Sequence, residues 1–301
     1  MNAMLEFIDS LKKGFEVWNK AWLTQIFALL ILSFVAMLVI APLAFMIAIY
    51  SAGGTTIITN PSTFLTESLI QAMAANPGFW LALILTILVG AIFLTIIFGA
   101  IQKIAHDYIT GAKVSFEKTI KELIPLIPAL IVVCLASLVI LLIPALIVAE
   151  IANIYRDVYP PIMSFILFQG TVSITIVDVA LAGVTVLIFI LLGGPYFLSV
   201  SAVVIDGAGF YGIRDGWKLY LRKFLSVATA MVILFIILIP IGLTFFLPIN
   251  GIVLAGSSLE LILLNVFILM LLGVVLGFFA SNWIDTSLYV FYTDIRGKKS
   301  N

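Results

Sequence analysis

"GIRDGWKLYLRKFLSVATAMVILFIILIPIGLTFFLPI", residues 212–249, joins a short basic segment to a run without any charge, residues 224–249. The uncharged run is longer than the roughly 20 helical residues that cross about 30 Å of hydrocarbon. Membrane barrel strands are shorter and alternate with polar residues, a pattern that this run lacks. Because lipid offers the backbone no hydrogen-bond partner, we expect a transmembrane helix here.

Five further stretches have the same character, and the composition agrees with them. The 301 residues are 63% hydrophobic and 10% charged, with a mean hydropathy of +1.29, whereas a soluble domain is roughly 45–50% apolar and about 25% charged. We therefore predict an all-α polytopic integral membrane protein, with a single membrane domain over residues 1–301. Its six transmembrane helices are predicted at residues 22–50, 79–102, 123–149, 179–205, 224–249 and 261–284.

The cations are distributed unequally between the two sides that these six spans define. Of the 15 Lys and Arg residues, all but Arg156 lie in segments on the side of the N-terminus. Lys and Arg are retained in cytoplasmic segments, so we predict a multi-pass protein of the cell membrane with cytoplasmic N- and C-termini. Residues 285–301 then form the end of the last helix and a cytoplasmic tail. The net charge of zero argues against a nucleic-acid partner.

The basic segment before residue 224 is amphipathic. On a helix, one face would carry the apolar residues Phe210, Ile213, Trp217, Tyr220 and Phe224, and the other face the charged ones. This pattern is typical of a helix that lies in the membrane plane. Segment 1–21 repeats it, with Gly14 at the position of Gly216, and segment 111–123 is a weaker copy.

We predict that these amphipathic helices lie at the cytoplasmic interface and contact anionic lipid headgroups. Each cation near such a surface contributes about 1 kcal/mol. The predicted interface residues are Trp18, Lys20, Trp22, Arg214, Trp217, Lys218, Tyr220, Arg222 and Lys223.

Glycine and proline interrupt the span at residues 179–205. Gly193, Gly194 and Pro195 lie near its middle. Broken helices at this depth line binding sites in many transporters, but Gly and Pro are also common in transmembrane helices without such a role. We treat the three residues as a candidate helix break.

Ionisable residues gather near the cytoplasmic ends of the spans, where Lys103, His106, Asp107, Asp206 and Asp285 form a candidate polar cluster. Lys103 and Asp107 are four residues apart and can pair along one helix face. Ion pairing at helix ends is the favoured interpretation, and a proton or substrate site is the alternative.

No pattern of catalytic residues is present in the sequence. His106 is the only histidine and Cys134 the only cysteine, whereas a zinc site requires several such ligands. The sequence also lacks a G-x-S-x-G motif, a P-loop and a G-x-G-x-x-G motif. We predict that the protein is not an enzyme and holds no metal and no cofactor.

Two stretches, "AVVIDGAGFYGIRDGWKLYLRKF" (202–224) and "TSLYVFYTDIRGKK" (286–299), resemble the glycerophosphoryl diester phosphodiesterase membrane-domain family of bacterial and archaeal membrane proteins. In that family a proline-containing span ends in an acidic turn, matched by Pro195 and Asp206–Gly207, and an amphipathic helix follows. The last span closes on a pattern matched by Tyr292, Asp294 and Arg296. The resemblance implies a membrane module without the family's separate hydrolase barrel.

The sequence therefore favours a non-enzymatic membrane protein that organises lipid or membrane partner proteins. The alternative is a small transporter, channel or lipid scramblase with a path between Pro/Gly-broken helices. A homo-oligomer is a further possibility, because Gly273 and Gly277 have the spacing of a close helix contact.

Overall fold

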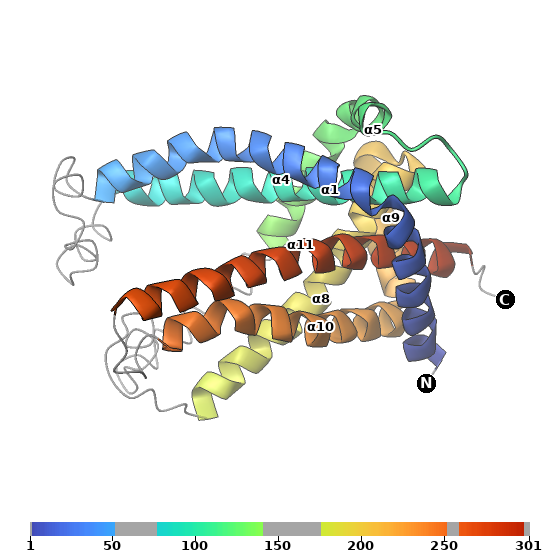
Figure 1. Cartoon of the computed structure of the whole chain (residues 1–301). Coiled ribbons are helices and arrows are strands. Elements are labelled where there is room, and N and C mark those ends of the chain that lie inside the picture. Colours follow the sequence, from blue (N-terminus) through green and yellow to red (C-terminus); the bar gives the residue numbers. More distant parts are fainter. Residues whose placement is uncertain (1, 52–76, 141–175, 252–258, 298–301) are drawn as a thin grey trace.

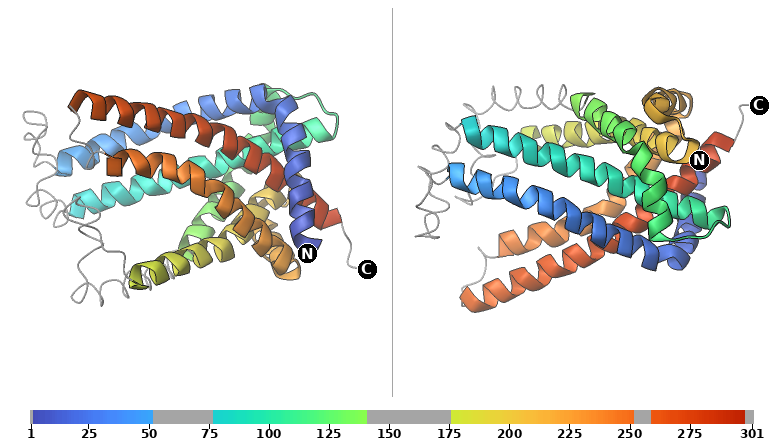
Figure 2. Two further views of the ribbon diagram at one scale, coloured as in Figure 1. Left: turned by 60° about the horizontal axis from the view of Figure 1, so that its bottom comes forward. Right: turned by 90° about the horizontal axis from the view of Figure 1, so that it is seen from above.

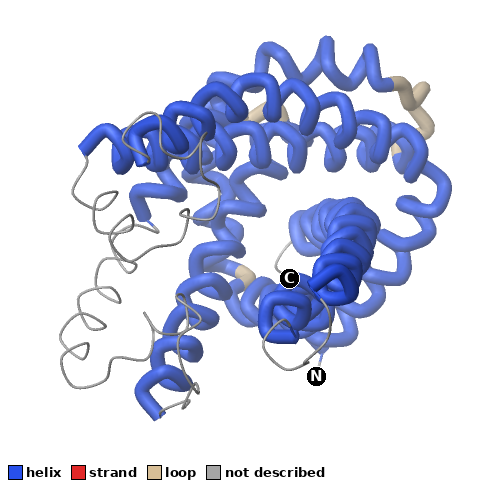
Figure 3. The backbone as a smooth tube through the Cα atoms, turned by 60° about the vertical axis from the view of Figure 1, so that its left-hand side comes forward, coloured by secondary structure: helices blue, strands red, loops and turns tan. Residues whose placement is uncertain are grey.

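The computed structural model describes residues 2–51, 77–140, 176–251 and 259–297. Figure 3 shows helices joined by short connections, and the described residues contain no strand. The all-α prediction is confirmed for this part of the chain.

Five helices form the body of the molecule, and their lengths follow from the long apolar runs. They are α1 (Asn2–Ser51), α4 (Pro77–Ile109), α8 (Ile176–Asp206), α10 (Phe224–Gly251) and α11 (Leu259–Gly297). At 1.5 Å per residue, even the shortest, α10 with 28 residues, is longer than the hydrocarbon core is thick. Residues 127–140 form a further helical stretch, whose predicted continuation to residue 149 lies outside the described residues.

The described chain contains three helical stretches that are long and apolar enough to cross a membrane: Met4–Leu43, Trp80–Ile109 and Phe116–Ile140. A fourth is obtained if the bent pair Gly209–Arg222 and Phe224–Leu238 is counted as one span. These counts rest on length and composition of the described residues, and they agree with a membrane-spanning protein.

The amphipathic segment 1–21 and the span at 22–50 belong to one helix. Helix α1 runs without interruption from Asn2 to Ser51, but its N-terminal part turns away from the remainder (Figure 1). The other two amphipathic segments are separate short helices, α5 (Phe116–Leu123) and α9 (Gly212–Arg222). Each adjoins a short 3-10 turn, η2 (Ile124–Leu126) after α5 and η3 (Gly209–Tyr211) before α9.

All these amphipathic pieces lie at one end of the helix bundle. The start of α1, the helices α5 and α9, and the end of α11 gather on the right of Figure 1 and in both views of Figure 2. Helix α9 meets α10 at an angle of 96°. The three expected in-plane helices thus share one end of the molecule with both chain termini.

Small residues hold the amphipathic helices against the long ones. A Cβ atom added to Gly216 in α9 would come within 2.6 Å of Ser199 Cα in α8. A Cβ atom added to Gly14 in α1 would come within 2.5 Å of Ser287 Cα in α11. Only glycine permits these backbone approaches, so each amphipathic helix is closely packed on a long helix.

The predicted helix break at residues 193–195 is wrong. Helix α8 is continuous from Ile176 to Asp206 with Pro195 inside it, and the Ser199 hydroxyl donates to the Pro195 carbonyl at 2.7 Å. Gly194 serves packing instead, because an added Cβ would lie 2.7 Å from Val227 Cγ1 and 3.0 Å from Tyr220 Cε2.

Candidate functional site

A cavity of about 300 Å³ lies between α4, α8, α10 and α11. Its wall is almost entirely apolar, and aromatic rings from α4 and α8 contribute to it: Phe98, Tyr196 and Phe197. Two side chains, Gln102 and Asp285, supply polar groups that can hydrogen-bond or carry charge deep in this wall. An apolar hollow with few polar groups is the usual form of a small-molecule site.

A second cavity, of about 380 Å³, adjoins the first between α1, α4 and α11. The two cavities share Leu94, Phe98 and Asp285. Asp285 therefore borders both hollows, and they form one candidate binding region around a single carboxyl group.

The Asp285 carboxyl is buried, and the part of the chain that the structure describes gives its Oδ2 atom no partner. Its residue is only 4% exposed, and Oδ2 accepts no hydrogen bond from the residues that the structure describes. The described ion pairs also do not include Asp285. An ionised carboxylate buried in this way costs several kcal/mol unless a positive group or donor reaches it.

Other unpaired acceptors lie on the same helix face and on α1 opposite it. Asn282 precedes Asp285 by one turn, and its Oδ1 atom is buried without a described partner, as is Oε1 of Gln25. Gln25 is held in place by its amide, which donates to Thr286 Oγ1 at 2.9 Å. The α1–α11 interface therefore offers more buried acceptors than donors.

Helical spacing explains why these groups converge. Positions 282, 285 and 286 are three and four residues apart, so they share one face of α11. The lack of a charged residue in the α1 stretch 21–51 then leaves Asp285 without a cation from that side.

The first cavity is lined by one residue of the candidate helix break and by one residue of the candidate polar cluster. Gly193 and Asp285 both line the 300 Å³ cavity. Near them, the Tyr196 hydroxyl is 2.7 Å from Thr95 Oγ1. Tyr196 and Gln25 could not be selected from the sequence, because both lie in uncharged runs where periodicity does not single them out.

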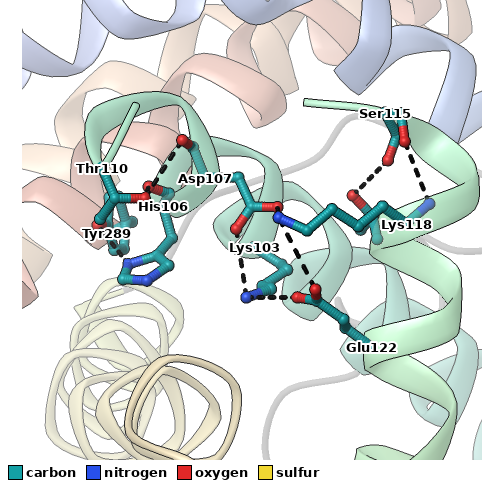
Figure 4. Close-up of polar contacts among 9 residues, drawn as sticks. Lys103, His106, Asp107, Thr110, Ser115, Lys118, Glu122 and Tyr289 are labelled. Atoms are coloured by element: carbon teal, nitrogen blue, oxygen red, sulfur yellow. Dashed lines mark hydrogen bonds and ion pairs between the residues drawn. The ribbon is translucent and has the colours of Figure 1, made fainter. Parts of the chain in front are cut away.

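Two members of the predicted polar cluster, Lys103 and Asp107, belong to a separate ion-pair network (Figure 4). Lys103 Nζ is 3.3 Å from Asp107 Oδ1 and 2.7 Å from Glu122 Oε2. Lys118 Nζ is 2.8 Å from Asp107 Oδ2. The predicted pairing of Lys103 with Asp107 is confirmed, and the network ties α5 to α4.

His106 belongs to neither the cavity nor the ion pairs. Its Nδ1 atom is 2.9 Å from the Tyr289 hydroxyl (Figure 4). Within the described residues, no group of three or more His, Cys, Asp or Glu side chains could hold a metal ion.

Asp206 connects the ends of two long helices. It follows the apolar part of α8, accepts a hydrogen bond from the Tyr292 hydroxyl and forms an ion pair with Arg296. Asp294 instead pairs with Lys13, at 3.5 Å. The acidic turn and the terminal pattern that carried the family resemblance are thus in contact with each other.

The predicted interface residues divide into two groups. Arg214, Lys218 and Arg222 are exposed on α9, which suits a headgroup contact. Tyr220 is only 4% exposed and packs on Gly194 and Val227, so its ring contacts protein rather than a lipid headgroup. Gly194 lacks a side chain, and this leaves room for the Tyr220 ring inside the protein.

The remaining interface residues lie within α1 and within or next to α9. Trp18 and Trp217 are partly buried, Lys20 and Trp22 are exposed, and Lys223 is the partly buried residue that ends α9. Trp18 packs edge-on against Phe279.

Comparison of the chain with protein-family models, with curated proteins and with solved structures finds no match. The resemblance to the phosphodiesterase membrane-domain family therefore stays a prediction from its short motifs.

Proposed function

We propose that this chain is a six-span carrier or transporter that binds an amphipathic molecule between its helices. The observation that carries this proposal is the pair of adjacent apolar cavities that both border the buried residue Asp285. A bundle that served only as a scaffold would gain stability by filling this space with side chains. The proposal is a form of the transporter alternative, without a broken helix.

The proposed orientation has both termini in the cytoplasm. The segregation of Lys and Arg supports it, and so does the position of both termini at one end of the bundle (Figure 1). The cavity is then reached from the bilayer or from the cytoplasmic end, where Asp285 follows the last predicted span.

A fluorescent apolar dye that is uncharged at neutral pH, 1-aminoanthracene, tests for the cavity in the full chain reconstituted in nanodiscs. We expect saturable binding by the wild type and loss of binding in Gly193→Leu. Gly193 lines the cavity, and an added Cβ would meet only Met231 Sδ, at an ordinary 3.5 Å. A larger side chain at this position therefore extends into the hollow.

Gly183→Leu is the matched control, because Gly183 lies on the same helix, is exposed, and has no atom within 4 Å of an added Cβ. Equal dye binding by the wild type and Gly193→Leu, or no saturable binding by the wild type, would contradict the proposal.

A second candidate function is the organisation of lipid at the cytoplasmic face. Helix α9 and its flanks expose apolar side chains, Phe210, Tyr211, Leu221, Phe224 and Leu225. Exposed cations lie beside them at Arg214, Lys218 and Arg222. Anionic lipid that stays bound through purification, in a protein whose cavity binds no dye, would favour this function.

A further inference from the structure

The carboxyl at the centre of the cavity region suggests which chemical class of molecule enters it. We propose that the ligand is an organic cation whose alkylammonium group pairs with Asp285. This inference rests on the binding function proposed above. The ligand's apolar part then occupies the cavity beside Phe98 and Tyr196.

The first argument is the absence of an internal counter-charge. The helices that pack on this part of α11 are α1, α4, α8 and α10. Helix α10 has no ionisable residue, and the charged residues of α1 all precede position 21. On α4, Lys103 is already paired with Asp107 and Glu122, and His106 with Tyr289.

The remaining neighbours do not supply a positive charge either. On α8, the Tyr196 hydroxyl is engaged by Thr95, and Asp206 is paired with Arg296. On α11 itself, the nearest titratable group is Tyr289, which carries no positive charge. A cation that enters the cavity would therefore be the partner that the described chain does not provide.

The second argument is the chemistry of the wall, which suits an organic cation better than a metal ion. Calcium requires six to eight oxygen ligands and magnesium a near-ideal octahedron, but this cavity offers Asp285 and Gln102 in an apolar lining. Aromatic faces attract alkylammonium groups through their quadrupoles, and Phe98 and Tyr196 supply such rings. A carboxylate among aromatic rings recognises positive charge and apolar bulk together.

Two probes of nearly equal shape test the charge requirement. Benzyltrimethylammonium carries the charge, and neopentylbenzene replaces its nitrogen by carbon. Each is titrated against 1-aminoanthracene bound to the full chain in phosphatidylglycerol nanodiscs. We expect the wild type to bind both probes, and Asp285→Asn to weaken the cation at least about tenfold while neopentylbenzene is unaffected.

Asp294→Asn is the matched control, because Asp294 lies on the same helix in a partly exposed pair with Lys13. Dye binding by Asp285→Asn shows that the cavity is intact in this variant. Equal cation affinity in the wild type and Asp285→Asn would overturn the proposal. Binding of the dye and neopentylbenzene without the cation would overturn it too, but would leave the proposed binding function in place.

The cationic group can belong to a free amine or to the choline headgroup of a lipid. Titration in two kinds of nanodisc with the same phosphatidylglycerol content distinguishes these sources: in one the remaining lipid is phosphatidylcholine, and in the other it is an uncharged galactolipid, so that the surface charge is equal. A weaker apparent affinity for benzyltrimethylammonium in the phosphatidylcholine nanodiscs supports the site and identifies the headgroup as a competitor. An unchanged affinity supports the site with a free amine as its ligand.

Discussion

At the scale of single residues, three aspartates of similar sequence context have different environments. Asp107 is surrounded by Lys103 and Lys118, and Asp206 by Tyr292 and Arg296. Asp285 is buried without a described partner. The first two fasten helices together, because their charge is compensated inside the protein, whereas Asp285 has charge or hydrogen-bonding capacity left for a ligand.

Two glycines also have equivalent roles in different helices. Gly14 and Gly216 coincide when the amphipathic segments are overlaid, and each lies against the backbone of a serine, Ser287 and Ser199 respectively. The internal similarity of the two segments thus corresponds to a similar mode of packing on a long helix.

We expect Gly216→Ala to destabilise the protein by about 1–3 kcal/mol, since overpacking at a close backbone contact forces the helices apart. Ser199 Cα would lie 2.6 Å from the new methyl group. The thermal unfolding midpoint in detergent measures the loss. Gly183→Ala should cause no loss, because nothing lies near its Cβ position. Equal midpoints for Gly216→Ala and the wild type would show that α9 is not held by this contact.

Some features of single residues could be predicted from the sequence, and others could not. Asp285 could be selected because it lies directly after an uncharged run. The pairing of Lys103 with Asp107 could be predicted because the two residues are four positions apart. The contact of Asp285 with a cavity that includes Leu94 and Gly193 depends on how separate helices pack. No local pattern carries that information in a single sequence.

At the scale of elements, the uncharged runs coincide with helices wherever the structure describes them, but some of these helices extend beyond the runs. Helix α4 continues from residue 102 to Ile109, and α11 from residue 284 to Gly297. Charged and polar residues indicate where the membrane-spanning part of a helix ends. The helix itself continues beyond that point where its side chains contact a neighbouring helix. In α4 those partners belong to α5.

The α4–α5 network gives an element-scale prediction. Asp107 is almost fully buried and pairs with two lysines, so Asp107→Asn removes one of the two carboxylates that they share and leaves only Glu122. We expect faster amide hydrogen exchange over α5, Phe116–Leu123, because fewer contacts hold it to α4.

Glu117→Gln provides the comparison for this variant. The Glu117–Lys121 pair is within α5 and largely exposed, and such pairs contribute little. Its exchange should match the wild type. If Asp107→Asn also exchanged at the wild-type rate, apolar packing rather than the ion pairs would be what holds α5.

At the scale of the whole molecule, the distribution of charge and the shape agree. The short amphipathic helices, the start of α1 and the end of α11 gather at one end of the bundle (Figures 1 and 2), and the ion pairs described above join residues of these elements to the adjoining ends of α4 and α8. A membrane protein whose charged residues gather at one end of the bundle exposes its cations to one compartment. In the orientation proposed above from the positive-inside rule, that compartment is the cytoplasm, and the proposed access route to Asp285 depends on the same orientation.

Labelling of single cysteines from outside intact cells tests this orientation. The buried native thiol is first removed by Cys134→Ala, and Lys218→Cys or Ile57→Cys is then introduced. A membrane-impermeant maleimide should modify Ile57→Cys directly, because residue 57 follows the first predicted span on the side without cations. Lys218→Cys, on the exposed face of α9, should react only after the membrane is permeabilised. The opposite pattern would invert the protein in the membrane and place the Asp285 end of the cavity outside the cell.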